Sequence, residues 1–324
     1  MGTLLLAAIA LAGAPAASVV YIVAAELALG RLAVRPRRAL RPWVWLAPAL
    51  AFVAVFLVYP TLDTVVLSVR DATGAAWIGL ANYAFALGSR DALIALRNTV
   101  IWLVLFTGLV VGGGLGIAAL AERVRYDAAV RGIVFLPMAL SFTAAGVIWK
   151  FVYEFRPAGA PQIGLLNAVL GAAVPGFEPR AWLVGPPWNT LLLIAAGVWT
   201  WVGFATVVFA AALKAVPAEI AEAARVDGAG EWRVFRQITL PLLGPTTGAV
   251  ATAMVITALK VFDVVYVMTS GNFDTDVLAT RMYHALFVDQ HLGRAAALAV
   301  ILLAATVPVM AVNLRRLRRE AAAR

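Results

Sequence analysis

The sequence contains no cysteine and few charged residues. Without cysteine, neither disulfide bonds nor thiolate metal ligands can contribute to its structure or chemistry. Only 13% of the 324 residues are Asp, Glu, Lys or Arg, whereas 63% are apolar. Soluble domains are roughly a quarter charged and about half apolar. This composition excludes an ordinary soluble domain and predicts an integral membrane protein.

Long apolar runs recur along the whole chain. A membrane-spanning helix needs about 20 mostly apolar residues, and no low-complexity linker separates the runs that meet this length. We therefore predict an all-α polytopic membrane protein. The seven predicted spans are residues 3–25, 43–68, 98–121, 132–153, 189–213, 245–268 and 293–314.

The net charge of +9 could indicate nucleic-acid binding, so the positions of the basic residues decide its meaning. Most of the Lys and Arg residues lie in segments 31–42, 121–132, 214–244 and 315–324, which alternate along the chain with connections that carry fewer basic residues. Basic segments of this kind stay in the cytoplasm. The pattern indicates a lipid bilayer and no nucleic acid. It predicts an inner (plasma) membrane protein with its N-terminus outside and its C-terminus in the cytoplasm.

The first apolar run could be a signal peptide or a retained anchor. It lacks a basic n-region and precedes a basic stretch that would resist export, so we expect a retained helix. The loops 69–97, 154–188 and 269–292 then lie outside. Short surface helices are expected after Gly79 and after Gly164.

The basic segment 214–244 differs from the other connections. Residues 218–226 are mostly strong helix formers, and Gly228 or Gly230 can supply the left-handed turn that ends such a helix. Residues 231–240 form a second amphipathic stretch. We predict two short helices with a break at Gly228.

Several chemical functions are excluded. No Gly-x-x-x-x-Gly-Lys-Ser/Thr phosphate loop occurs, so the chain is not a nucleotide-binding subunit. No Ser-His-Asp arrangement or paired carboxylates indicate catalysis. His284 and His291 are spaced to share a helical face but have no metal-ligand cluster around them. We expect no enzyme activity, no cofactor and no metal.

The run Glu222-Ala223-Ala224-Arg225-Val226-Asp227-Gly228-Ala229, followed by Phe235, Ile238, Leu240 and Pro241, resembles the EAA loop of ABC-importer permeases. The resemblance implies that residues 219–227 form a coupling helix that receives motion from ATPase subunits. Glu222 would meet polar or basic groups there, Ala223 and Ala224 would allow close seating, and Gly228 would permit the turn. The alternative is an amphipathic loop that lies on the membrane surface.

Other motifs favour the sugar branch of these permeases. Gly79-Leu80-x-Asn82-Tyr83, Asn98-Thr99 and Phe135-Leu136-Pro137 resemble the maltose-type subfamily. Residues 262–269, 281–283 and 293–296 are most similar to alpha-glucoside permeases. The resemblance implies a six-span permease domain over 43–316, an added N-terminal anchor with a basic linker over 1–42, and a basic tail over 317–324.

The resemblance also implies partners. These are a second homologous permease, two ATPase subunits and an external solute-binding protein that delivers a sugar. The family's sugar contacts come from the spans that flank the EAA loop. The matching positions here are Thr200, Trp201 and Phe204, then Thr257, Ala258 and Val261.

Lys260 and Asp263 are ionisable residues inside a predicted span, where charge is costly. Their spacing of three predicts that they share one helix face. They could hydrogen-bond sugar hydroxyls, or they could form an ion pair that holds the helix to its neighbours. Because the two charges cancel, we expect a neutral cargo, with an alpha-glucoside preferred. The alternatives are a non-sugar solute and an ion-coupled secondary transporter.

Overall fold

The computed structural model describes residues 19–157 and 159–322. The chain divides into two compact units, residues 1–64 and 65–324, each of which is described by itself. The described residues are almost entirely helical and contain no strand beyond an isolated bridge between Arg70 and Trp77. The predicted all-α class is confirmed.

The first unit contains a short apolar helix, Val19–Gly30, and α2 (Val34–Val53), which continues through a π turn (Ala54–Val58) into α3 (Tyr59–Leu67). Its Glu26 carboxylate lies 3.0 Å from Arg41 and 3.6 Å from Arg37. α2 begins at Val34, whereas the predicted span begins at residue 43, so part of the predicted linker is helical. Most of the predicted first span, 3–25, lies outside the described residues.

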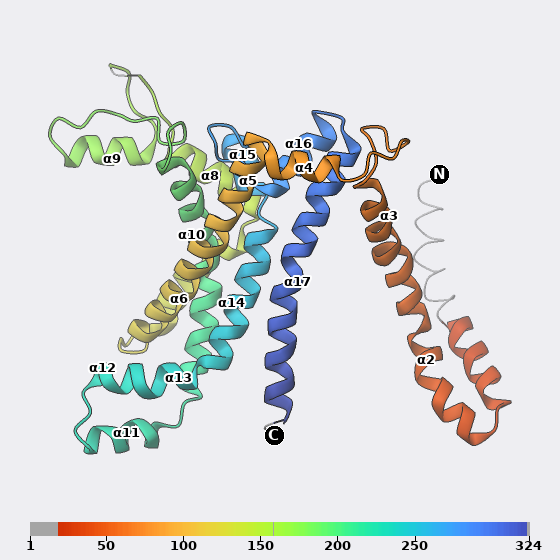
Figure 1. The fold of residues 1–324 in the computed structure, drawn as a ribbon. Coiled ribbons are helices and arrows are strands. Elements are labelled where there is room, and N and C mark those ends of the chain that lie inside the picture. The colour runs from red at the N-terminus through yellow and green to blue at the C-terminus, as the bar shows by residue number, and fades with distance from the viewer. Residues whose placement is uncertain (1–18, 158, 323–324) are drawn as a thin grey trace, which may run out of the picture. The chain divides into compact units, whose positions relative to one another are not determined.

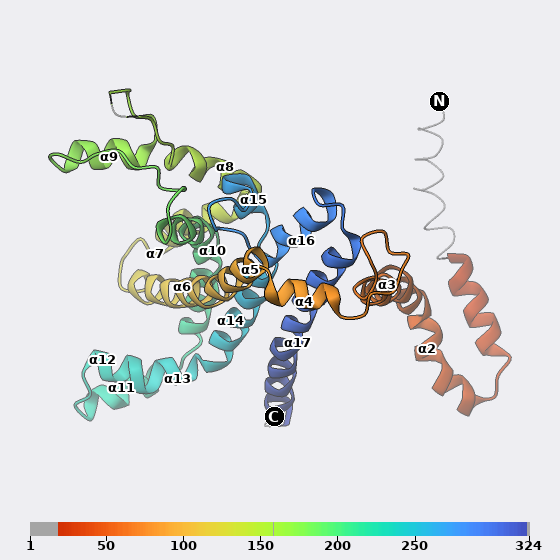
Figure 2. The same cartoon turned by 45° about the horizontal axis from the view of Figure 1, so that its top comes forward.

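The second unit contains three uninterrupted spans. The first joins α5 (Arg90–Ile101), a π turn (Trp102–Phe106) and α6 (Thr107–Ala121). The others are α10 (Trp188–Lys214) and α17 (Leu292–Ala322). Figures 1 and 2 show α6 and α10 side by side.

The predicted single span 132–153 is bent instead. α7 (Asp127–Phe135) ends in a 3-10 turn (Leu136–Ala139), and α8 (Phe142–Val152) leaves at 101°. Pro137 lacks the N–H that a continuous helix needs, and Ser141 caps the new helix by accepting a hydrogen bond from the Ala144 N–H. The run Glu231–Leu242 similarly meets α14 (Gly244–Leu259) at 68°. Counting each bent pair as one span, up to six helices can cross the membrane.

Short helices lie at the two ends of the second unit (Figure 1). One end, here called the α11 end, carries α11 (Ala218–Val226), α12 (Glu231–Val234) and α13 (Leu240–Leu242). The opposite end, called the α16 end, carries α4 (Ala81–Gly88), α9 (Leu165–Ala173), α15 (Asp263–Thr269) and α16 (Leu278–Phe287). The surface helices predicted after Gly79 and Gly164 are therefore present as α4 and α9.

Buried asparagines hold the loops at the α16 end. Asn98, which is 0% exposed, donates to the carbonyl oxygens of Asp274 and Asp276 at 2.7 and 2.8 Å. Asn189 donates to the Phe273 carbonyl at 2.6 Å, and Asn82 donates to the Arg70 carbonyl at 2.7 Å. These bonds satisfy loop carbonyls that would otherwise be buried without partners. Asn82 and Asn98, which belong to the sugar-branch motifs, therefore have structural contacts here.

The histidines do not share a helix. His284 belongs to α16, which ends at Phe287, and Gln290 has a positive φ of 51° just before His291. The prediction that their spacing places them on one helical face is wrong, because the chain turns between them.

The core of the second unit depends on close approach of α6 and α10. A Cβ atom at Gly114 would lie 2.4 Å from the Ala205 Cβ and 3.0 Å from backbone atoms of α10. Trp102, Phe106 and Phe209 are fully buried in the same core, where Trp102 and Phe106 pack beside Gly197 of α10. Small residues that let helix backbones approach are the usual basis of packing in membranes.

We expect Gly114→Ala to destabilise the protein by about 1–3 kcal/mol, because the added methyl group overpacks this contact. Gly116→Ala is the matched control, since a Cβ there meets nothing within 4 Å and alanine favours the helix by about 0.5–1 kcal/mol. Thermal unfolding followed by size-exclusion chromatography measures both. Equal melting temperatures for the two variants would contradict the proposed packing.

Candidate functional site

A helix break lies at the predicted Lys260–Asp263 pair. α14 ends at Leu259, and α15 begins only at Asp263, after Phe262 with φ −139° and ψ −60°. The prediction that the two residues share one helix face is wrong, because residues 260–262 interrupt the helix between them. Non-helical backbone at membrane depth is tolerated where it lines a cavity or is buried in protein.

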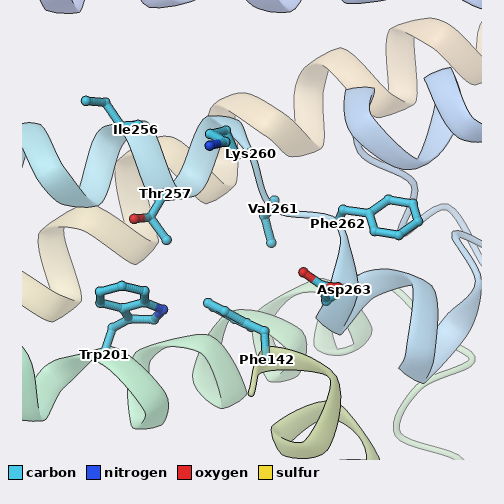
Figure 3. A pocket seen from close by; sticks show the side chains of 8 residues that line it. All are labelled: Phe142, Trp201, Ile256, Thr257, Lys260, Val261, Phe262 and Asp263. Carbon is cyan, nitrogen blue, oxygen red and sulfur yellow. The ribbon is translucent and has the colours of Figure 1, made fainter. Parts of the chain in front are cut away.

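A cavity of about 190 Å³ lies beside this break. Side chains from α8, α10, α14 and the break surround it (Figure 3). Five of the predicted pathway residues are among them. The lining residues are Phe142, Trp201, Ile256, Thr257, Lys260, Val261, Phe262 and Asp263.

One wall of the cavity is aromatic and carries a free donor. The rings of Phe142 and Trp201 are 6.2 Å apart, between centroids. The indole N–H of Trp201 is buried and has no hydrogen-bond partner among the described residues. Figure 3 shows this nitrogen facing the space between Trp201, Phe142 and Thr257. An indole N–H can only donate, so it suits a ligand oxygen.

The opposite wall carries the polar groups. The Thr257 hydroxyl donates to the Ala253 carbonyl at 2.9 Å and can still accept a hydrogen bond. Asp263 lies 3.4 Å from the Thr143 hydroxyl, which donates to it. No salt bridge joins Lys260 to Asp263, or either one to another charged residue, within the described part of the chain. Both charged groups are exposed and available to a ligand.

Three of the predicted pathway positions do not line the cavity, namely Thr200, Phe204 and the buried Ala258. Thr200 is buried and donates to the Ala196 carbonyl of its own helix at 3.0 Å. Phe204 packs edge-on against Trp201 at 5.9 Å, behind the aromatic wall. Conversely, Phe142, Ile256 and Phe262 line the cavity but were not predicted to do so. No sequence signal distinguishes these apolar residues from ordinary packing residues of a span.

The predicted coupling segment forms a capped helix at the α11 end. α11 spans 218–226 as predicted, and Gly228 follows it with φ +84°. The Ala229 N–H donates to the Ala224 carbonyl, and the Gly228 N–H donates to the Arg225 carbonyl. This pair of bonds is a Schellman motif, in which glycine supplies the left-handed residue. The Schellman motif explains why Gly228 lies at a fixed distance in the sequence after Ala223 and Ala224, since the left-handed residue must directly follow the end of the helix.

The coupling segment presents most of its residues to solvent. Glu222, Ala223, Asp227 and Gly228 are exposed, whereas Ala224 and Ala229 are half-buried. The Arg225 guanidinium donates to Glu231 at 2.6 and 3.3 Å, which joins α11 to α12. This hydrogen bond, together with the charge of Glu231, raises the pKa of Arg225 above its ordinary value. The segment is an ordered helix with a free outer surface.

No cluster of three or more His, Asp or Glu side chains with metal-binding geometry occurs in residues 19–157 and 159–322.

Comparisons with known proteins agree on the type of protein. The chain is 48% identical to an osmoprotective compounds uptake permease, GgtC of Synechocystis sp., over 86% of this chain and 99% of that protein. It is 40% identical to the alpha-glucoside transport system permease AglF of Rhizobium meliloti, over 88% of this chain and 85% of that protein.

A solved structure has a similar fold. A chain of a bacterial ABC transporter that imports the acidic polysaccharide alginate aligns with a TM-score of 0.72 and 25% identity, over 88% of this chain and 99% of that one. Residues 108–319, more than half of the sequence, match the family described as the inner membrane component of binding-protein-dependent transport systems. The chain belongs to this family of multi-pass permeases.

Proposed function

We propose that this chain is the permease subunit of an ATP-driven importer for a neutral, hydroxyl-rich solute of the alpha-glucoside class. The observation that carries the proposal is the exposed, Schellman-capped helix at the α11 end, in a chain that lacks a phosphate loop of its own. A permease that hydrolyses nothing must receive motion from ATPase subunits, and a rigid helix can transmit it.

In this proposal the outer surface of α11 docks into a cleft of the ATPase. Glu222 supplies a carboxylate for polar or basic groups, and Ala223 leaves room for close seating. Asp227, Gly228 and Ala229 hold the turn that ends the helix. The ion pair between Arg225 and Glu231 fixes α11 to α12, so displacement of α11 moves the broken span that continues into α14.

The cavity beside the helix break is the proposed solute site. A pyranose has an apolar face, which suits the rings of Trp201 and Phe142, and a rim of hydroxyls, which suits the indole N–H, Thr257, Lys260 and Asp263. The volume of this cavity, about 190 Å³, is below the range of roughly 300–1,000 Å³ usual for ligand pockets. We infer that a second permease subunit closes the other side.

Two cargo types within this class have support from relatives. The similarity to the alpha-glucoside permease supports an alpha-glucoside cargo, and the similarity to the uptake permease for osmoprotective compounds supports an osmoprotective cargo. A neutral glucoside satisfies both. The absence of a charged partner for Lys260 and Asp263 among the described residues favours a ligand that both can hydrogen-bond.

The proposed orientation places the α11 end in the cytoplasm and the α16 end outside. A reporter fused after Arg41 is expected to be cytoplasmic, and one fused near residue 175 external, because basic segments resist translocation. Alkaline phosphatase and fluorescent-protein fusions at both positions measure this. The reverse pattern would reject the orientation.

Reconstitution tests the function itself. Proteoliposomes that contain this chain, its partner permease, the ATPase subunits and the solute-binding protein are expected to accumulate labelled maltose or another alpha-glucoside only when ATP is supplied. Omitting the ATPase subunits should reduce uptake to background. Uptake by this chain alone, driven by an ion gradient, would instead support a secondary transporter.

A further inference from the structure

A groove runs over α7 and α10, apart from the solute cavity. The two helices touch at Gly203, where a Cβ atom would lie 2.2 Å from the Val134 carbonyl oxygen and 2.6 Å from the Phe135 Cα. Between this contact and the α11 end lies an open groove of about 450 Å³. Its lining residues are Arg131, Gly132, Phe135, Val207, Ala211 and Lys214.

The groove has an apolar floor and a basic rim. Phe135 and Val207 are 40% and 39% exposed, although both belong to membrane-spanning segments. Arg131 and Lys214 stand at the end of the groove where α10 terminates. Asp127 pairs with Arg131 and lies 3.4 Å from Lys214. Two cations share one carboxylate, so the rim keeps a net charge of +1.

This combination matches one kind of molecule. An exposed apolar floor on spanning helices faces hydrocarbon chains, and cations at the end of a span lie at the level of lipid headgroups. Basic sites between helices on the cytoplasmic side bind anionic headgroups, and each cation near the membrane surface strengthens binding of an anionic lipid about fivefold. A zwitterionic lipid would gain no such benefit from the net charge.

We propose that the groove between α7 and α10 binds an anionic phospholipid. The headgroup phosphate contacts Arg131 and Lys214, and one acyl chain lies along Phe135, Val207 and Ala211. The Asp127 carboxylate orients both cations and limits the affinity by its own charge.

Native mass spectrometry of the full, delipidated chain titrated with phosphatidylglycerol tests the site. Arg131→Gln and Lys214→Gln are each expected to weaken binding about fivefold. Gly132→Leu should reduce it as well, because a Cβ at Gly132 meets nothing within 4 Å and the larger side chain fills the groove. Asp127→Asn should increase affinity, because it raises the net charge of the rim.

The matched control is Arg125→Gln, which removes the same charge from an exposed arginine that does not line the groove. It should leave binding unchanged, and melting temperatures verify that each variant is folded. The proposal would be overturned by an equal loss of phosphatidylglycerol binding in Arg125→Gln or by equal binding of phosphatidylcholine. Displacement of the bound lipid by inorganic phosphate alone would also overturn it. Loss of the bound lipid on assembly with the partner permease would show that a protein helix covers the groove instead.

Discussion

Glu222→Lys is expected to reduce ATP-driven uptake about a hundredfold, because it places a positive charge where the proposed ATPase surface presents polar or basic groups. Like-charge contacts in an interface cost several kcal/mol. Glu222 is exposed, so the substitution should leave the fold intact. Uptake by proteoliposomes and copurification of the ATPase subunits measure the effect.

Glu178→Lys provides the control for charge alone. This exposed glutamate follows α9 at the α16 end, far from the proposed docking surface, and the substitution makes the same charge change. Normal uptake is expected for this variant. If Glu222→Lys also keeps its ATPase subunits and normal uptake, α11 is not the coupling helix.

The turn after α11 offers an independent test of the same assignment. Proline at position 228 would fix φ near −65° where the chain needs +84°, and it would remove the N–H that donates to the Arg225 carbonyl. We expect Gly228→Pro to uncouple ATP hydrolysis from uptake. Gly230→Ala is the control, since its φ of −69° suits any residue and a Cβ there meets nothing within 4 Å.

The second large effect concerns the solute cavity. The double variant Lys260→Met with Asp263→Leu is expected to raise the half-saturating solute concentration at least tenfold, since a hydrogen bond to a charged group contributes about 1.5–3 kcal/mol. Both side chains are exposed at the cavity and make no ion pair with each other in the part of the chain that the structure describes. The loss should therefore appear in transport and not in folding.

Lys150→Met is the matched control for this experiment. Lys150 is an exposed lysine of α8 that lies outside the cavity lining, where its ammonium group is 3.5 Å from the Val267 carbonyl. A stably assembled double variant with unchanged affinity and rate would reject the site. Trp201→Phe tests the contribution of the indole N–H separately, because it keeps an aromatic ring and removes the unpaired N–H.

Local signals in the sequence were sufficient for several elements. The helix 218–226 has its predicted bounds because strong helix formers lie between Pro217 and a glycine that adopts a positive φ. α10 differs from the predicted span 189–213 by one residue at each end. Such features depend on residues that are neighbours in the chain, so they can be predicted without knowledge of the tertiary fold.

Other features depend on contacts between distant segments. The break at residues 260–262 contains neither glycine nor proline, so nothing in Lys260-Val261-Phe262 signals it, and it occurs where α15 packs against α8. α2 begins at Val34 and so includes the arginines of the predicted linker, because arginine is a good helix former.

The sequence by itself determined that this protein is an all-α membrane protein with a short capped helix, 218–226, ahead of its last spans. Apolar run length, charge position and a local capping motif are properties of contiguous residues. Only the tertiary structure decided which residues share a cavity. Phe142 joins Trp201 and Thr257 there, whereas Thr200, one residue from Trp201, faces the core. Helix rotation and helix breaks are set by packing between spans, and a single sequence does not record that packing directly.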